Sequence, residues 1–289
     1  MNSQFEVLDY AVFIAYAVLV LFIGTWVSRN KKGQQKSAED YFLASKSLPW
    51  WAIGASLIAA NISAEQFIGM SGSGYKVGLA IASYEWMAAI TLIVVGKYFL
   101  PIFIEKGIYT IPEFVEKRYS KELKTILAVF WISLYVFVNI ASVLYLGSLA
   151  LETILGIPMI YGVMGLSLFA ASYSLYGGLS AVAWTDVIQV IFLILGGLVT
   201  TYLALDTVSG GDGFFAGLST IYNEAPERFA MILDKENPEY SNLPGIAVLV
   251  GGMWVANLYY WGFNQYIIQR TLAAKSLKEA QKGILLAAF

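Results

Sequence analysis

The residues that decide the fold are Gly54-Ala-Ser-Leu-Ile-Ala-Ala-Asn-Ile-Ser-Ala-Glu-Gln-Phe-Ile-Gly69. They form the centre of an apolar run over residues 50–74, long enough for a membrane span, which needs about 20 residues. Asn61, Glu65 and Gln66 fall at its middle, where a charged side chain facing lipid costs at least ~2.5 kcal/mol. Irregular backbone is tolerated there only if it lines a cavity or is buried in protein. We therefore predict a broken helix whose freed carbonyl oxygens suit a small cation; the alternative is a continuous helix that binds its neighbours.

The composition of the whole chain also indicates a membrane protein. Of its 289 residues, 58% are hydrophobic and 13% are charged, whereas soluble domains carry about 25% charge. The net charge of −2 offers no basic surface for nucleic acid. The chain contains neither Cys nor His, which removes thiolate and imidazole chemistry and the usual zinc ligands. We therefore expect no enzyme and no nucleic-acid partner, but a lipid bilayer around the protein.

Apolar stretches divide the chain into seven expected spans within one transmembrane domain over residues 1–289. The spans cover about residues 8–27, 50–74, 78–104, 124–151, 157–176, 184–205 and 244–268. An eighth apolar run begins at residue 283 and is too short to cross, so we expect a cut helix and a longer parent protein. The acidic stretch over residues 206–243 is expected to be an extracellular or periplasmic loop.

The distribution of basic residues predicts the orientation. Fourteen Lys and Arg side chains lie in the loops after spans one, three and seven, and three lie in the loops on the opposite side. Positively charged loops remain cytoplasmic. We therefore predict a multi-pass protein of the cell (inner) membrane with its N-terminus outside.

Two further spans carry polar groups at depth. Glu85 lies between two aromatic residues, an arrangement suited to a polyhydroxylated ligand, because a carboxylate accepts from hydroxyls while a ring covers the C–H face. Asn257, Tyr260 and Trp261 have the spacing i, i+3, i+4 and share one helical face. The alternatives are a structural Glu with a nearby donor and an amphipathic helix that packs on its neighbours. Asn139 is expected to hydrogen-bond between helices.

The run from Gly54 to Gly69 resembles the first core helix of the sodium/solute symporter family. Tyr173 to Ala181, which ends Tyr-Gly-Gly-Leu-Ser-Ala, resembles that family's signature. The similarity extends from Arg29 to Phe289, is greatest to the bacterial sodium/galactose (glucose) branch, and covers the N-terminal half of a family member. It implies an all-α membrane protein with the inverted-repeat fold of the amino-acid transporter LeuT. The fold would be truncated here, with the first repeat complete and the second only begun.

The resemblance implies sodium-coupled uptake of a sugar and assigns site residues by motif. The residues that match the sugar site are Gln66, Glu85 and Asn257, with Asn61 in support and Tyr260 stacked over the sugar as an inner gate. The residues that match the outer gate are Met70 and Tyr84. The groups that match the sodium path are the backbone carbonyls of Ala59 and Ile62 and, on the inward route, Asp186.

The sequence departs from the family pattern at Ala88, where the sugar branch has a Ser that touches the sugar. The resemblance also implies further sodium-binding Ser residues and a sugar-contacting Lys beyond Phe289. Other functions stay open: symport of another solute such as myo-inositol, a transporter-like sensor domain, or an ion channel. The sequence does not define the oligomeric state.

Overall fold

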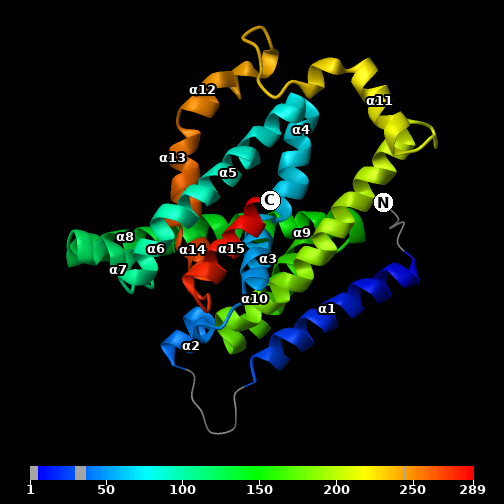
Figure 1. Cartoon of the computed structure of the whole chain (residues 1–289). Coiled ribbons are helices and arrows are strands. Elements are labelled where there is room, and N and C mark those ends of the chain that lie inside the picture. The colour runs from blue at the N-terminus through cyan, green and yellow to red at the C-terminus, as the bar shows by residue number, and fades with distance from the viewer. Residues whose placement is uncertain (1–5, 30–36, 244) are drawn as a thin grey trace.

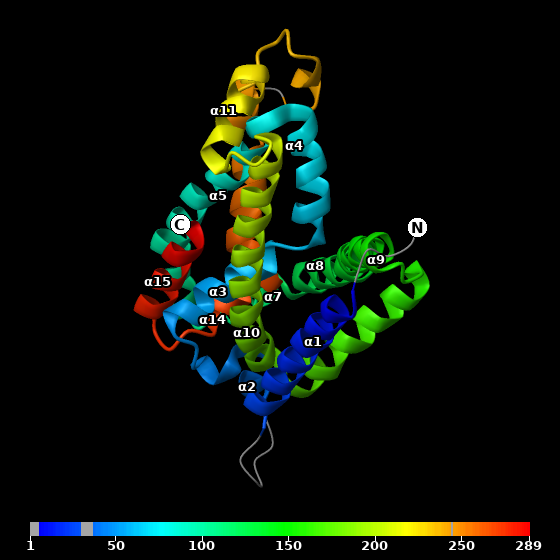
Figure 2. The ribbon, with the colours of Figure 1, turned by 90° about the vertical axis from the view of Figure 1, so that its right-hand side faces the viewer.

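The structure is a computed structural model that describes residues 6–29, 37–243 and 245–289, without the side chain of Tyr84. Helices make up the regular elements of these ranges, apart from one isolated bridge between Leu48 and Ala274. The helices form an open bundle in which segments far apart in the sequence lie side by side, as Figures 1 and 2 show. The all-α prediction is therefore confirmed.

The expected span over residues 50–74 is interrupted. Its first part is α3 (Trp50–Asn61), and its second part is the π-helical η2 (Glu65–Met70) continued by α4 (Ser71–Val77). Before it come α1 (Val7–Val27), α2 (Ala38–Leu43) and the short η1 (Ala44–Lys46).

A second group of helices surrounds α3. The return span contains η3 (Gly78–Ala82), α5 (Ser83–Val94), η4 (Val95–Phe99) and α6 (Leu100–Glu105). The amphipathic α7 (Ile111–Arg118) then leads to a long span of α8 (Lys121–Leu134), η5 (Tyr135–Ile140) and α9 (Ala141–Leu155).

The longest helix, α10 (Met159–Val208), contains 50 residues. A straight helix of that length would measure roughly 75 Å, well beyond a bilayer of about 30 Å. Its backbone turns at Gly178, where φ is 62° and ψ is −153°. A Cβ there would lie 2.4 Å from the carbonyl oxygen of Tyr41, so the turn needs glycine. The two spans predicted over residues 157–176 and 184–205 are thus the two arms of α10, and the turn between them is shorter than expected.

A loop region, the second interrupted span and one further helix follow α10. The loop over residues 206–243 contains α11 (Phe214–Glu224), η6 (Pro226–Phe229) and η7 (Pro238–Ser241). The span consists of α12 (Gly245–Val250), α13 (Met253–Leu258), the π-helical η8 (Tyr259–Phe263) and α14 (Gln265–Leu272). The last helix is α15 (Leu277–Ala288), which begins six residues before the apolar run at residue 283.

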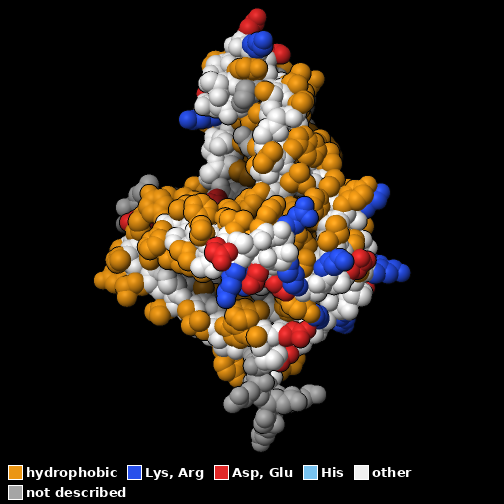
Figure 3. All heavy atoms as spheres, turned by 90° about the vertical axis from the view of Figure 1, so that its left-hand side faces the viewer, with side chains coloured by type: hydrophobic (Ala, Val, Ile, Leu, Met, Phe, Trp, Pro, Cys, Tyr) orange, Lys and Arg blue, Asp and Glu red, His pale blue; other side chains and the backbone are white. Residues whose placement is uncertain are grey.

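The surface and the length of the helices agree with a multi-pass membrane protein. Among the described residues, four helices are long and apolar enough to cross a membrane, or five if a pair bent by 71° counts as one span. The sequence-based number of seven spans stays a prediction. Hydrophobic side chains cover most of the face in Figure 3, whereas charged side chains gather in a band on its lower half and at the tip. The main core lies where α3, α5, α14 and α15 meet, around Ile53, Leu57, Leu92, Ile268 and Ile284.

Candidate functional site

The break in the first interrupted span lies where the sequence predicted it. Ile62 ends α3 with φ −86° and ψ 111°, which is extended backbone. The Ser63 N–H donates to Gln66 Oε1 at 2.8 Å, whereas in a continuous helix it would donate to the Ala59 carbonyl. The Gln66 N–H donates to the Ser63 carbonyl at 3.1 Å instead of that of Ile62. The carbonyls of Ala59 and Ile62 therefore lose the donors that a regular helix would supply.

The second interrupted span has a break of the same backbone type. Asn264 separates η8 from α14 with φ −79° and ψ 119°. Its Oδ1 accepts a hydrogen bond of 2.7 Å from the Tyr135 hydroxyl. Around it, the Tyr266 hydroxyl donates to that of Tyr260 at 2.9 Å, and the ring of Tyr259 in η8 stacks on Trp131. This break is filled by side chains.

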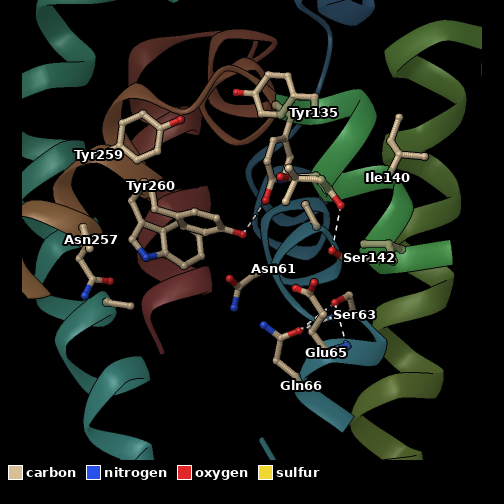
Figure 4. A pocket seen from close by; sticks show the side chains of 18 of the residues that line it. Asn61, Ser63, Glu65, Gln66, Tyr135, Ile140, Ser142, Asn257, Tyr259 and Tyr260 are labelled. Atoms are coloured by element: carbon tan, nitrogen blue, oxygen red, sulfur yellow. Dashed lines mark hydrogen bonds between the residues drawn. The ribbon is translucent and has the colours of Figure 1, made fainter. Parts of the chain in front are cut away.

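Residues of both interrupted spans line one cavity of about 1080 Å³. The five residues that the resemblance assigns to the sugar site all line it: Asn61, Gln66, Glu85, Asn257 and Tyr260. Figure 4 shows Asn61 and Gln66 on one side of this space and Tyr260 and Asn257 on another, so both interrupted spans contribute. The structure thus brings together residues that lie almost 200 positions apart in the chain.

The polar groups of the cavity are only partly paired. The Asn61 amide nitrogen lies 3.5 Å from Glu85 Oε2, at the long limit for a hydrogen bond. The Asn257 amide donates to the Met253 carbonyl at 3.1 Å within its own helix, which leaves its Oδ1 as an acceptor. A carboxylate has about four acceptor positions. The site therefore offers Glu85 and the amides to a ligand rich in hydroxyl groups.

The expected gate residues and Asp186 take separate places. Met70 lines a second cavity of about 530 Å³, which shares Asn61, Gln66 and Glu85 with the first. The side chain of Tyr84 lies outside the described residues. Asp186 is buried away from the lining of both cavities, where its carboxylate accepts from Ser56 Oγ at 2.5 Å and lies 3.6 Å from Arg270 Nη2.

One polar wall of the larger cavity was missed by the sequence reasoning. Tyr135, Asn139 and Ser142 project into the larger cavity from η5 and the start of α9. The sequence interpretation gave Asn139 an interhelical hydrogen bond, since one amide in an apolar span has that role more often than a site role. The π-helical turn of η5 is the feature that marks this wall, because such turns concentrate at functional sites.

Two interrupted spans around a shared polar cavity define a class, the secondary transporters built on broken helices. The chain belongs to the sodium:solute symporter family, whose model matches residues 41–289. The resemblance noted in the sequence is therefore confirmed.

Several relatives support this membership. The chain is 75% identical, over 98% of its length, to 52% of the sodium/glucose cotransporter of Vibrio parahaemolyticus. It is 34% identical, over 97% of its length, to 42% of the human sodium/myo-inositol cotransporter 2. The chain thus spans about half the length of the curated relatives it matches. These relatives are transporters by name and not enzymes.

A solved structure supports the LeuT-like fold. It shows a Na⁺-coupled sialic acid symporter in a substrate-bound outward-open state, and it superposes with a TM-score of 0.83 at 26% identity. The match covers 99% of this chain and 57% of that one. The first interrupted span and the helices around it therefore have the arrangement of a sodium-coupled transporter.

Proposed function

We propose that the full-length protein imports a hexose of the galactose or glucose type together with sodium. It acts in the cell (inner) membrane with its N-terminus outside. The observation that carries the proposal is the cavity in which Glu85, Gln66, Asn257 and the Tyr260 ring surround one space beside a helix break.

Sugar recognition follows from the chemistry of these side chains. The Glu85 carboxylate accepts from two hydroxyls, and the amides of Gln66 and Asn257 both donate and accept. The ring of Tyr260 covers the C–H face of the sugar and separates it from the inner side. Asn61 supports the site from the break, and Met70 and Tyr84 close it from outside.

Sodium binds at the break itself. A small hard cation prefers oxygen ligands, and unwound backbone carbonyls supply them in transporters of this architecture. The Ala59 and Ile62 carbonyls are released from helical hydrogen bonding next to the sugar pocket. Asp186, which is buried beside Arg270, lies on the inward route and receives the ion after release.

Coupling arises because both ligands order the same interrupted span. Bound sodium favours the sugar-binding arrangement of Gln66, and bound sugar favours the sodium site to the same degree, since coupling between two sites is reciprocal. The membrane potential adds about 2.3 kcal/mol per charge per 100 mV and drives uptake. Movement of Tyr260 then opens the inner exit.

Ala88 modifies this site without changing its type. It is buried and lines both cavities, where a Ser would offer the sugar a hydroxyl. Loss of one neutral hydrogen bond costs about 0.5–1.5 kcal/mol. We therefore expect weaker sugar binding than in a relative with Ser, and Ala88→Ser should tighten it.

The test is Glu85→Ala in the full-length protein reconstituted in liposomes. Sugar-dependent sodium uptake should be lost, because the change removes the carboxylate beside Asn61 that accepts from the sugar hydroxyls. Glu122→Ala, which removes an exposed carboxylate at the start of α8, is the matched control and should transport normally. Unchanged sugar-dependent uptake by Glu85→Ala would refute the assignment.

A second substrate is favoured by the relatives named as myo-inositol cotransporters in human and mouse. The cavity binds hydroxyl groups around a six-membered ring, and a cyclohexane polyol offers the same groups as a hexose. Competition by galactose, glucose and myo-inositol against one labelled sugar distinguishes a hexose substrate from a myo-inositol substrate. Stronger competition by myo-inositol than by either hexose would replace the hexose proposal.

A further inference from the structure

The outer ends of the two interrupted spans are joined by one loop segment. Residues 226–243 lie over the end of α4 and precede α12 in the chain, as Figures 1 and 2 both show. A small apolar cluster holds them together, and its buried members come from the α4–η3 corner, the loop and α12: Val77, Ala80, Leu233, Leu243 and Val248.

Arg228 fixes this segment to the first span. Its Nη1 donates to the Tyr75 carbonyl at 2.5 Å and also to the Lys76 carbonyl, both in the last turn of α4. The final carbonyls of a helix have no partners within the helix, and a cation there also opposes the negative end of the helix dipole. Arg228 Nε lies 3.9 Å from the Glu227 carboxylate, a weak pairing that does not compete with the carbonyls.

The backbone at Arg228 approaches α4 as closely as its side chain does. Gly78, which ends α4, has φ 68°, and a Cβ added there would lie 2.3 Å from the Arg228 carbonyl oxygen. Close backbone contact and two charge-assisted hydrogen bonds thus act on the same helix end. The helix continues without a break from α4 into η2, which carries Gln66.

We propose that Arg228 is a positioning residue that makes the outer halves of both interrupted spans move as one body. It sets the outer mouth of the cavity and, through α4 and η2, the place of Gln66. The proposal rests on the proposed function only in taking this cavity as the substrate site. The ligand of this cavity would be a neutral polyol. Arg228 does not touch it and acts on it only through the position of Gln66.

The test combines transport with a distance measurement in the full-length protein. None of the 289 residues is Cys, so, once any Cys outside these residues is replaced, spin labels at Tyr75→Cys and Val250→Cys report the separation of α4 from α12. Arg228→Ala should broaden this distance distribution and raise the sugar KM about two- to fivefold, the change typical of a cation at a helix C-terminus. Arg228→Lys keeps the charge but loses the planar guanidinium. Its distance distribution and its sugar KM should lie between those of the unchanged protein and those of Arg228→Ala.

The matched control is Lys235→Ala, which removes one positive charge from the same loop. It should change neither the distance distribution nor the sugar KM. An Arg228→Ala protein with an unchanged distance distribution would overturn the proposal. So would a broadened distribution in the Lys235→Ala control. Because the distance is measured without transport, a protein that moves no sugar refutes the proposed function and leaves this test intact.

Discussion

The two breaks share one backbone conformation but differ in what surrounds them. Ile62 and Asn264 both have φ near −80° and extended ψ. At Ile62, the N–H of Ser63 turns to the Gln66 side chain, so the Ala59 carbonyl loses its helical donor beside the cavity that Ala60, Asn61 and Ser63 line. At Asn264, Tyr135 supplies a hydrogen bond and the neighbouring rings fill the space.

Under the proposed function, this difference gives the two breaks separate roles. A break surrounded by small residues, here Ala59, Ala60 and Ala64, presents bare oxygens and suits a cation. A break surrounded by tyrosines is closed by its own side chains and suits a gate. The partners of the freed backbone, rather than the dihedral angles, decide the role.

The largest effect is expected at the first break, from Gln66→Ala. Without the Gln66 acceptor, the Ser63 N–H donates to the Ala59 carbonyl, which restores the regular helical hydrogen bond across the break. Sodium affinity, measured without sugar by calorimetry on the full-length protein, should fall about tenfold or more. The ion then loses the Ala59 carbonyl as a ligand, and the loss of one such buried partner costs about 1–3 kcal/mol. Gln66→Glu keeps an acceptor oxygen and should retain most of the affinity. Equal sodium affinity in Gln66→Ala and the unchanged protein would contradict this account of the break.

A smaller effect is expected at the filled break, from Tyr135→Phe. The change removes the donor to Asn264 Oδ1 but keeps the ring, and should lower the free energy of unfolding by about 1 kcal/mol. Thermal unfolding in detergent would measure the loss, with Tyr145→Phe on the exposed face of α9 as control. Sodium affinity should stay the same, and a fall in it would mean that the two breaks do not have separate roles.

The smallest effect is expected from Tyr260→Phe, which tests the gate role of the second interrupted span. The ring that faces the sugar is retained, and only the hydrogen bond from Tyr266 is lost. Sugar KM should change less than twofold, while release to the inside should become modestly faster, since one neutral hydrogen bond contributes about 0.5–1.5 kcal/mol. Efflux from preloaded liposomes measures release, and slower efflux would argue against a gate at this position.

Much of the first break was predictable, because polar residues at mid-membrane depth have few permitted environments. Asn61 and Gln66 could be expected at an interruption of the span on that ground, whereas a structural pairing of Glu85 stayed open and its place in the sugar site came from the family resemblance. The wall formed by Tyr135, Asn139 and Ser142 could not be, since single polar residues in an apolar span usually serve helix packing. Contacts such as that of Arg228 with α4 join positions about 150 apart, and nothing in local spacing indicates them.

The turn at Gly178 has a consequence for how the chain enters the bilayer. Its two arms are joined by a single left-handed residue, and Gly177 beside it is packed against the Ser28 hydroxyl. Such a corner leaves no polar loop between one arm and the next. We expect the translocon to receive both arms together as a helical hairpin, so that a bulky residue at Gly178 would appear first as a defect of biogenesis.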